Sequence, residues 1–180
     1  HLSIRRQRQM CIRDSPTTIA GFHLNKDSAP VLDELKKSVD RNAVDFSQIN
    51  ILDYDDNHSF YEALGVPSEQ VYSISLDDDA ESLINDRIKT KENKGKLTLQ
   101  VVSIDNTGHL DVNIRQGLMK AREIILVVTG AEKSEVIKRL YEENGKSNFL
   151  PADLKVHRMV TVVLDRAAAD GLPEDVKEYF

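Results

Sequence analysis

The stretch EIILVVTGAEKSEVIKRL, residues 123–140, decides the fold class of this chain. Its first six residues are mostly branched and apolar, a run typical of a strand that is buried on both faces. Gly130 follows, and apolar residues then recur at helical spacing at Val136, Ile137 and Leu140. A buried strand joined through a short glycine turn to an amphipathic helix is the repeating unit of a parallel α/β sheet.

The same alternation extends along the chain in both directions. Runs rich in valine and isoleucine predict five further strands, at 17–23, 49–54, 70–75, 97–104 and 160–165. Helical patterns fall between them, at 29–40, 59–65, 80–91 and 131–145, with Ser28 as the expected N-cap of the first. The alternation predicts an α/β protein, a Rossmann-like three-layer sandwich with a mostly parallel sheet.

Composition limits the classes of function. The chain has 180 residues, 40% of them hydrophobic, which suits one domain with a single core. A net charge of -6 argues against a nucleic-acid partner, because polyphosphate recognition needs a clustered basic surface. No apolar stretch is long enough to cross a membrane. Cys11 is the single cysteine, which excludes an internal disulfide or a CxxC metal site and favours a reducing, cytoplasmic setting.

Residues 1–15 differ in character from the rest. They carry four arginines against one aspartate and have no apolar core of the kind that a secretory signal needs. We interpret 1–15 as a non-native extension, a basic arm for an acidic partner being the alternative. Residues 16–180 then form a single domain, from which we expect a native N-terminal strand and helix to be missing.

Four segments follow predicted strands and should meet at one edge of the sheet, where such folds bind ligands: 21–30, 52–61, 104–113 and 128–133. In the last segment, Gly130 at a strand-to-helix turn lets backbone amides approach an anion, and Lys133 adds a positive charge. The alternative is a solvated lysine at a helix start. In the first segment, Gly21 and Ser28 suit a phosphate-binding turn, although neither a GxGxxG nor a P-loop pattern is present.

Two of these segments carry groups that can transfer protons. His109 follows Gly108 after a buried strand, where an imidazole can shuttle protons near neutral pH, or can simply be a solvated loop side chain. Asp53 at the end of the second strand can act as a general base. With Asp56 and His58 nearby, Asp53 could instead belong to a cation site, although the spacing matches no calcium loop. A further alternative is that the cluster caps the following helix, through Asp56 or Asn57.

Taken in order, the motifs KDSAP (26–30), ILDY (51–54), HSFYEAL (58–64), TGHLDVN (107–113), AREIILVVTGAEKSEVI (121–137) and LPADLKVHRMVTVVLDRAAADGL (150–172) resemble one family. It is the family of glucosamine-6-phosphate isomerase/deaminase and 6-phosphogluconolactonase. The last two motifs are long and specific, and the resemblance runs from about Thr17 to the end of the chain.

The resemblance implies a small-molecule sugar phosphate as ligand in carbohydrate metabolism, with no cofactor and no metal, and allows a homo-oligomer. His109 takes the role of the histidine that opens the sugar ring or activates water, and Asp53 the role of the base. Lys133 takes the phosphate role, with Gly21, Ser28, Gly108 and Gly130 lining the substrate. Asp53 also aligns with a neighbouring family glutamate, so its correspondence stays open.

The chain departs from the family pattern in several places. Ile114 stands where the family has a glutamate, Thr107 replaces an acidic or amide residue, and the several dozen residues of the family's lid are missing between Asn113 and Arg115. Two hypotheses therefore remain open. One is an active isomerase, deaminase or lactonase that transfers protons through His109 and Asp53. The other is a catalytically degenerate paralogue that binds a sugar phosphate or a partner without turnover.

Overall fold

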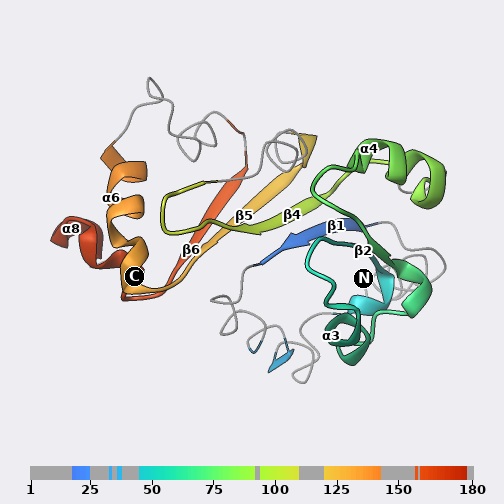
Figure 1. Cartoon of the computed structure of the whole chain (residues 1–180), viewed down its shortest axis with the longest axis horizontal. Helices are drawn as coiled ribbons and strands as arrows, with labels where there is room; N and C mark the ends of the chain where they lie inside the picture. Colours follow the sequence, from blue (N-terminus) through green and yellow to red (C-terminus); the bar gives the residue numbers. More distant parts are fainter. Residues whose placement is uncertain are drawn as a thin grey trace, which may run out of the picture.

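The computed structural model describes residues 18–24, 33, 36–37, 45–91, 94–109, 120–142, 157 and 159–177. Within them lies a six-stranded sheet of order β3-β2-β1-β4-β5-β6, in which every neighbouring pair is parallel (Figure 1). The strands are β1 (Thr18–His23), β2 (Ile49–Asp53), β3 (Val71–Ser73), β4 (Leu99–Ser103), β5 (Glu123–Val128) and β6 (Val160–Leu164). Each lies inside a predicted run, and the predicted Rossmann-like fold class is confirmed.

Helices connect the strands as the alternation predicts. The main ones are α3 (His58–Ala63), α4 (Ala80–Leu83) and α6 (Ser134–Glu142), with the short α8 (Glu174–Lys177) near the end of the chain. α4 continues as a π-helical turn, η4 (Ile84–Ile88). Short 3-10 turns are η2 (Phe46–Gln48), η3 (Ser68–Gln70), η5 (Ala131–Lys133) and η7 (Ala168–Gly171). The N-cap of α3 is Asn57, one of the two positions expected, although its side chain makes no capping hydrogen bond.

Side chains of the sheet alternate between two cores. Ile19, Leu52 and Ile124 point to one face, where α4, η4, α6 and η7 pack. Phe22 and Ile51 point to the other face and pack with α3. Because apolar layers cover both faces, the strands read as almost continuous hydrophobic runs. The molecule is therefore a three-layer sandwich, as predicted.

The topology creates a switch point in the middle of the sheet. β1 pairs with β2 on one side and with β4 on the other, and the chain adds strands outward in both directions from there. In parallel sheets, ligands bind outside the carboxyl ends of the strands next to such a point. The segments that follow β1, β2 and β4 are therefore the places to look for a site.

No helix among the described residues is long and apolar enough to cross a membrane. Several predictions concern other residues. These residues lie outside the described part of the chain: 1–15, Ser28, most of the predicted helix 29–40, and Ile114 with the point where the family's lid is missing.

Candidate functional site

Five of the predicted site residues lie at or beyond the carboxyl ends of strands. Asp53 ends β2, Gly108 and His109 follow β4, and Gly130 and Lys133 follow β5. They do not lie together along that edge, because β1 and β4 separate β2 from β5. With strands about 4.8 Å apart, the ends of β2 and β5 are about 14 Å apart. The fold thus brings the predicted residues to one edge but on two sides of the switch point.

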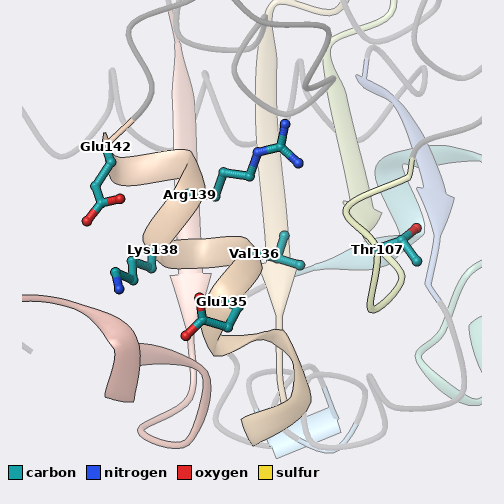
Figure 2. A pocket seen from close by; sticks show the side chains of 6 residues that line it. All are labelled: Thr107, Glu135, Val136, Lys138, Arg139 and Glu142. Carbon is teal, nitrogen blue, oxygen red and sulfur yellow. The ribbon is translucent and has the colours of Figure 1, made fainter.

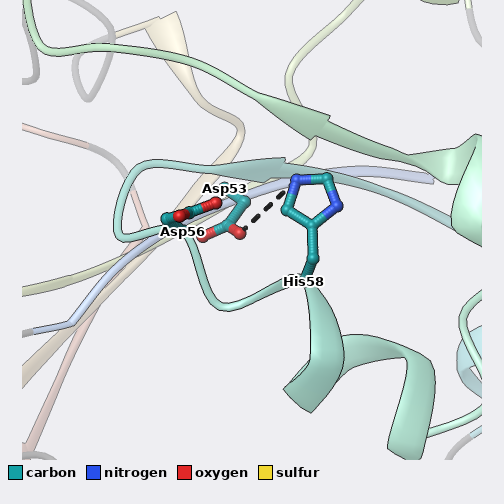
Figure 3. Close-up of side chains that lie close together, drawn as sticks. All are labelled: Asp53, Asp56 and His58. Atoms are coloured by element: carbon teal, nitrogen blue, oxygen red, sulfur yellow. Dashed lines mark ion pairs between the residues drawn. The ribbon is translucent and has the colours of Figure 1, made fainter.

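Asp53 is the most unusual of these side chains. It is 1% exposed at the end of β2, and its Oδ1 accepts a hydrogen bond of 3.1 Å from the backbone N–H of Asp55. Its Oδ2 is buried and has no hydrogen-bond partner among the described residues, while Nε2 of His58 lies 3.9 Å away (Figure 3). Burial raises the pKa of Asp53, opposed in part by the backbone N–H groups of Asp55 and Asn57 and by His58. A buried carboxylate oxygen without a partner is costly, and a ligand would satisfy it.

His58 lies at the start of α3, beside Asp53. Its Nε2 is 2.6 Å from Oγ of Ser73, at the end of β3. Asp56, in the turn between β2 and α3, has a positive φ of 57°. The side-chain donor atoms of Asp53, Asp56 and His58 all lie within 4.8 Å of one another.

The loop that carries His109 is a tight turn built around Asp105. Asp105 Oδ1 accepts hydrogen bonds from the backbone N–H groups of Thr107 and His109, both at 2.8 Å, and from Oγ1 of Thr107 at 2.6 Å. Gly108 has φ 76°, a left-handed conformation that glycine adopts without strain. The His109 side chain is exposed. The segment therefore turns a corner and presents an imidazole to solvent.

Asp105 has a perturbed pKa. Its partial burial alone would raise that pKa, but the hydrogen bonds from Thr107 and His109, and the His109 charge, outweigh this and lower it. The carboxylate form of Asp105 thus holds the loop together.

Gly130 and Lys133 differ from the prediction in what they touch. The N–H of Gly130 donates a 3.0 Å hydrogen bond to Oδ2 of Asp165, at the end of β6, so this amide is held by a carboxylate and not open to an anion. Gly130 has φ 102°, and a Cβ there would lie 2.2 Å from Oε1 of Glu132. Lys133, in η5, is 1% exposed. Lys133 is therefore not the solvated lysine of the alternative interpretation, and its phosphate role stays a prediction.

Gly21 lies inside β1, which continues to His23. Gly21 pairs with Gln100 of β4, and a Cβ on Gly21 would lie 2.1 Å from Oε1 of that buried side chain. Its role in the structure is to make room for Gln100 between two central strands.

A cavity of about 380 Å³ lies beside the His109 loop (Figure 2). Thr107 borders it on one side. The other side is formed by α6, with two cations, two carboxylates and one valine: Lys138, Arg139, Glu135, Glu142 and Val136. Its volume is in the range of small-molecule sites. In Figure 2, Arg139 and Val136 extend from α6 on the side that faces Thr107, whereas Lys138 and Glu142 extend the other way.

Sequence reasoning missed one pair at the switch point. Nδ1 of His23, the last residue of β1, lies 2.9 Å from Oδ1 of Asp55, and Oδ2 of Asp55 accepts a 2.7 Å hydrogen bond from the N–H of Leu24. The two side chains are 32 residues apart in the chain, and only the register of β1 with β2 brings them together. The available signal was that each follows a buried strand.

Comparisons with known proteins agree with this fold. No protein-family model matches the chain. Curated relatives include the glucosamine-6-phosphate deaminase of Oceanobacillus iheyensis, 38% identical over 57 residues, which are 32% of this chain and 23% of that protein. The same enzyme of Clostridium beijerinckii is 27% identical over 144 residues, covering 78% of this chain and 55% of that protein. The chain thus spans about half or less of the length of these two relatives.

Solved structures show the same architecture. A monomeric glucosamine-6-phosphate deaminase superposes with a TM-score of 0.65 at 18% identity, covering 92% of each chain. The 6-phosphogluconolactonase of Leishmania guyanensis gives 0.60 at 13% identity, covering 96% of this chain and 94% of that one. The fold and the sheet edge therefore define an α/β protein of the architecture that these two enzymes share. In sequence, the chain resembles the glucosamine-6-phosphate deaminases, and the resemblance that its motifs indicate is confirmed.

Proposed function

We propose that this chain binds a sugar phosphate of the glucosamine-6-phosphate or 6-phosphogluconolactone type, in carbohydrate metabolism. We propose further that His109 and Asp53 are its proton-transfer groups. The observation that carries the proposal is Asp53, a buried carboxylate at the carboxyl edge of the sheet. Its Oδ2 has no hydrogen-bond partner among the described residues. Relatives of the chain are named as glucosamine-6-phosphate deaminases. The cavity beside the His109 loop has a volume that suits a small ligand, but neither His109 nor Asp53 lines it.

The chemistry follows from the two side chains. A carboxylate such as Asp53 removes a proton from the carbon beside a carbonyl in an open-chain sugar and returns it to the neighbouring carbon. An exposed imidazole such as His109 exchanges protons with a ring oxygen or with water. It can therefore help to open a sugar ring, or take a proton from the water that attacks a lactone carbonyl. Because β1 lies between β2 and β4, a substrate that reaches both groups must lie across the switch point.

The assay for this proposal is turnover of glucosamine 6-phosphate and of 6-phosphogluconolactone by the full chain. We expect His109→Gln and Asp53→Asn each to lower kcat by a factor of about 10² to 10⁴, the scale of general acid–base catalysis. Asp77→Asn makes the same charge change as Asp53→Asn on an exposed side chain and should leave kcat unchanged. Turnover by wild type that neither variant at His109 nor at Asp53 reduces contradicts the assignment of these residues.

A second candidate function is binding without turnover, and two departures from the family pattern favour it. Ile114 stands where the family has a glutamate, and the family's lid residues are missing between Asn113 and Arg115. The burial of Lys133 does not distinguish the two functions, because a phosphate is held in both. A degenerate paralogue of this kind would hold a sugar phosphate, or a partner, without converting it.

Thermal denaturation with sugar phosphates distinguishes the two functions. A ligand that binds the folded state raises its stability by about 2.7 kcal/mol at a hundred times its Kd. The binding function predicts a higher Tm with millimolar glucosamine 6-phosphate and no product, whereas inorganic phosphate serves as the control for a nonspecific anion. An unchanged Tm with every sugar phosphate counts against both functions.

A further inference from the structure

The segment DYDDNH, residues 53–58, gathers two carboxylates and an imidazole at one place. Asp53 ends β2, Asp56 lies in the connecting turn, and His58 opens α3. The donor atoms of all three side chains lie within 4.8 Å of one another, and Oδ2 of Asp53 is 3.9 Å from Nε2 of His58 (Figure 3). Their donor atoms therefore lie close enough together to share one ion.

The burial of Asp53, which also supports the proposed function, indicates that this point takes a ligand. Oδ2 of Asp53 is buried, belongs to a side chain that is 1% exposed, and has no hydrogen-bond partner among the described residues. Buried polar atoms nearly always have a hydrogen-bond partner. A buried carboxylate oxygen without one, close to two other groups that can bind a metal, therefore needs an explanation. A cation at this point satisfies it.

The distances fit a small transition-metal ion. Zinc binds carboxylate oxygen and imidazole nitrogen at about 2.0 to 2.2 Å, so tetrahedral ligands lie about 3.4 Å apart. The Asp53 and His58 donors, at 3.9 Å, need to approach by only a few tenths of an ångström. Asp56 is exposed, so rotation of its side chain can close the remaining gap. His58 would exchange its contact with Ser73 Oγ for the metal.

The donor set also selects among cations. Magnesium and calcium prefer six or more oxygen ligands, whereas two carboxylates and one imidazole suit zinc and its neighbours in the first transition series. We propose that Asp53, Asp56 and His58 form a three-ligand site for Zn²⁺, with a fourth position open to water or to a substrate oxygen. The site is argued from its own contacts. Because it takes Asp53 as a ligand, bound Zn²⁺ should compete with the proton transfer proposed for that residue.

The test is a titration of the full, untagged chain with ZnCl₂, in which isothermal titration calorimetry measures binding and thermal denaturation measures Tm. The same titration with MgCl₂ is the comparison. We expect one Zn²⁺ bound through this site, a higher Tm with Zn²⁺ and no comparable effect of Mg²⁺. Asp56→Asn and His58→Gln should each weaken that binding by at least about tenfold to a hundredfold, a scale that even outer-shell substitutions reach. Asn tolerates the left-handed conformation of residue 56, so this variant should fold.

Matched controls are Asp77→Asn, which removes the same charge from an exposed position, and His109→Gln, which removes an exposed imidazole. Both should bind Zn²⁺ like wild type. The inference is overturned if wild type binds no Zn²⁺, or if Asp56→Asn and His58→Gln bind it as tightly as the two controls. None of these readouts requires turnover, so their failure leaves the proposed function standing, and absence of turnover leaves the metal site standing.

Discussion

At the scale of single residues, Asp55 connects two strands that the sequence keeps far apart. Its two oxygens accept from Leu24 N–H and lie against His23 Nδ1, so one carboxylate fixes the end of β1 to the turn after β2. Leu24 is buried, and its N–H would lose its partner if Asp55 were removed.

We therefore expect Asp55→Ala to lower the free energy of unfolding by about 1 to 3 kcal/mol, the cost of leaving a buried donor unsatisfied. Urea denaturation followed by circular dichroism measures this. Asp77→Ala, at an exposed position, is the control and should change stability by less than about 0.5 kcal/mol. Equal effects of the two substitutions would contradict the structural role of Asp55.

Gly171 illustrates a second kind of constraint. It lies in η7 against the start of α6, and a Cβ at this position would be 2.7 Å from the backbone oxygen of Ser134. A backbone atom inside a packed helix cannot move aside as a side chain can.

We expect Gly171→Ala to cost about 1 to 3 kcal/mol, as overpacking of a tight contact does. Gly65→Asn is the comparison, because no atom lies within 4 Å of a Cβ there and Asn tolerates its positive φ. The urea midpoints of both variants, measured side by side, should differ clearly. A Gly171→Ala protein as stable as wild type would show that η7 can move away from α6.

At the scale of elements, the loop after β4 depends on the charge of Asp105. The folded protein lowers the pKa of Asp105, because its carboxylate accepts bonds from Thr107 and His109. Because the pKa of Asp105 is lower in the folded state, its carboxylate stabilises the fold at any pH above the pKa of the unfolded chain, about 3.9. This stabilisation is lost as the pH falls through the folded-state pKa.

The difference in Tm between wild type and Asp105→Asn should therefore be largest near pH 7 and shrink below about pH 4. Asn keeps the shape of the side chain but loses the charge, so the comparison isolates the carboxylate. A difference in Tm that stays constant between pH 7 and pH 3 would be inconsistent with this explanation.

The elements themselves were largely predictable, because each strand is a short run of branched apolar residues and the helices between them show apolar spacing. The exceptions depend on tertiary contacts. The segment 80–91 reads as one ordinary helix, yet it turns π-helical at η4, where Ile84 and Ile88 both enter the core. The sequence around Lys133 is typical of a solvated helix start, but the Lys133 side chain is buried. Local sequence does not carry the information about what packs over these positions.

The candidate site was predictable only in part, for a related reason. That strand ends meet at one edge follows from parallel topology, so Asp53 and His109 were found from sequence. The hydrogen bond between Asp165 and Gly130, and the pair of His23 with Asp55, join residues 35 and 32 positions apart. Such contacts depend on the strand order and register, which periodicity does not specify.

At the scale of the whole molecule, the two cores share the central strands. β1 and β4 contribute side chains to both faces, whereas β3 has three residues and lies at one end of the described sheet. Backbone amides at the centre should be exposed to solvent only when the whole domain unfolds, and those of the end strands by local opening.

Native-state hydrogen exchange at increasing urea concentration measures this directly. We expect amides of Ile19 to Phe22 and of Val101 to Ser103 to exchange with the free energy of global unfolding. The amides of Tyr72 and Ser73 should exchange with a smaller free energy of opening. Slower exchange in β3 than in β1 would contradict a stable unit built around the switch point.

The position of β1 also has a consequence for synthesis on the ribosome. β1 and β2 emerge early and can pair at once, but the other side of β1 must wait for β4, whose first residue is Leu99. During that interval a nascent chain presents an apolar strand with unpaired backbone groups, the kind of edge that recruits other chains. Translation of residues 54 to 98 therefore sets how long this edge of β1 stays without its partner strand.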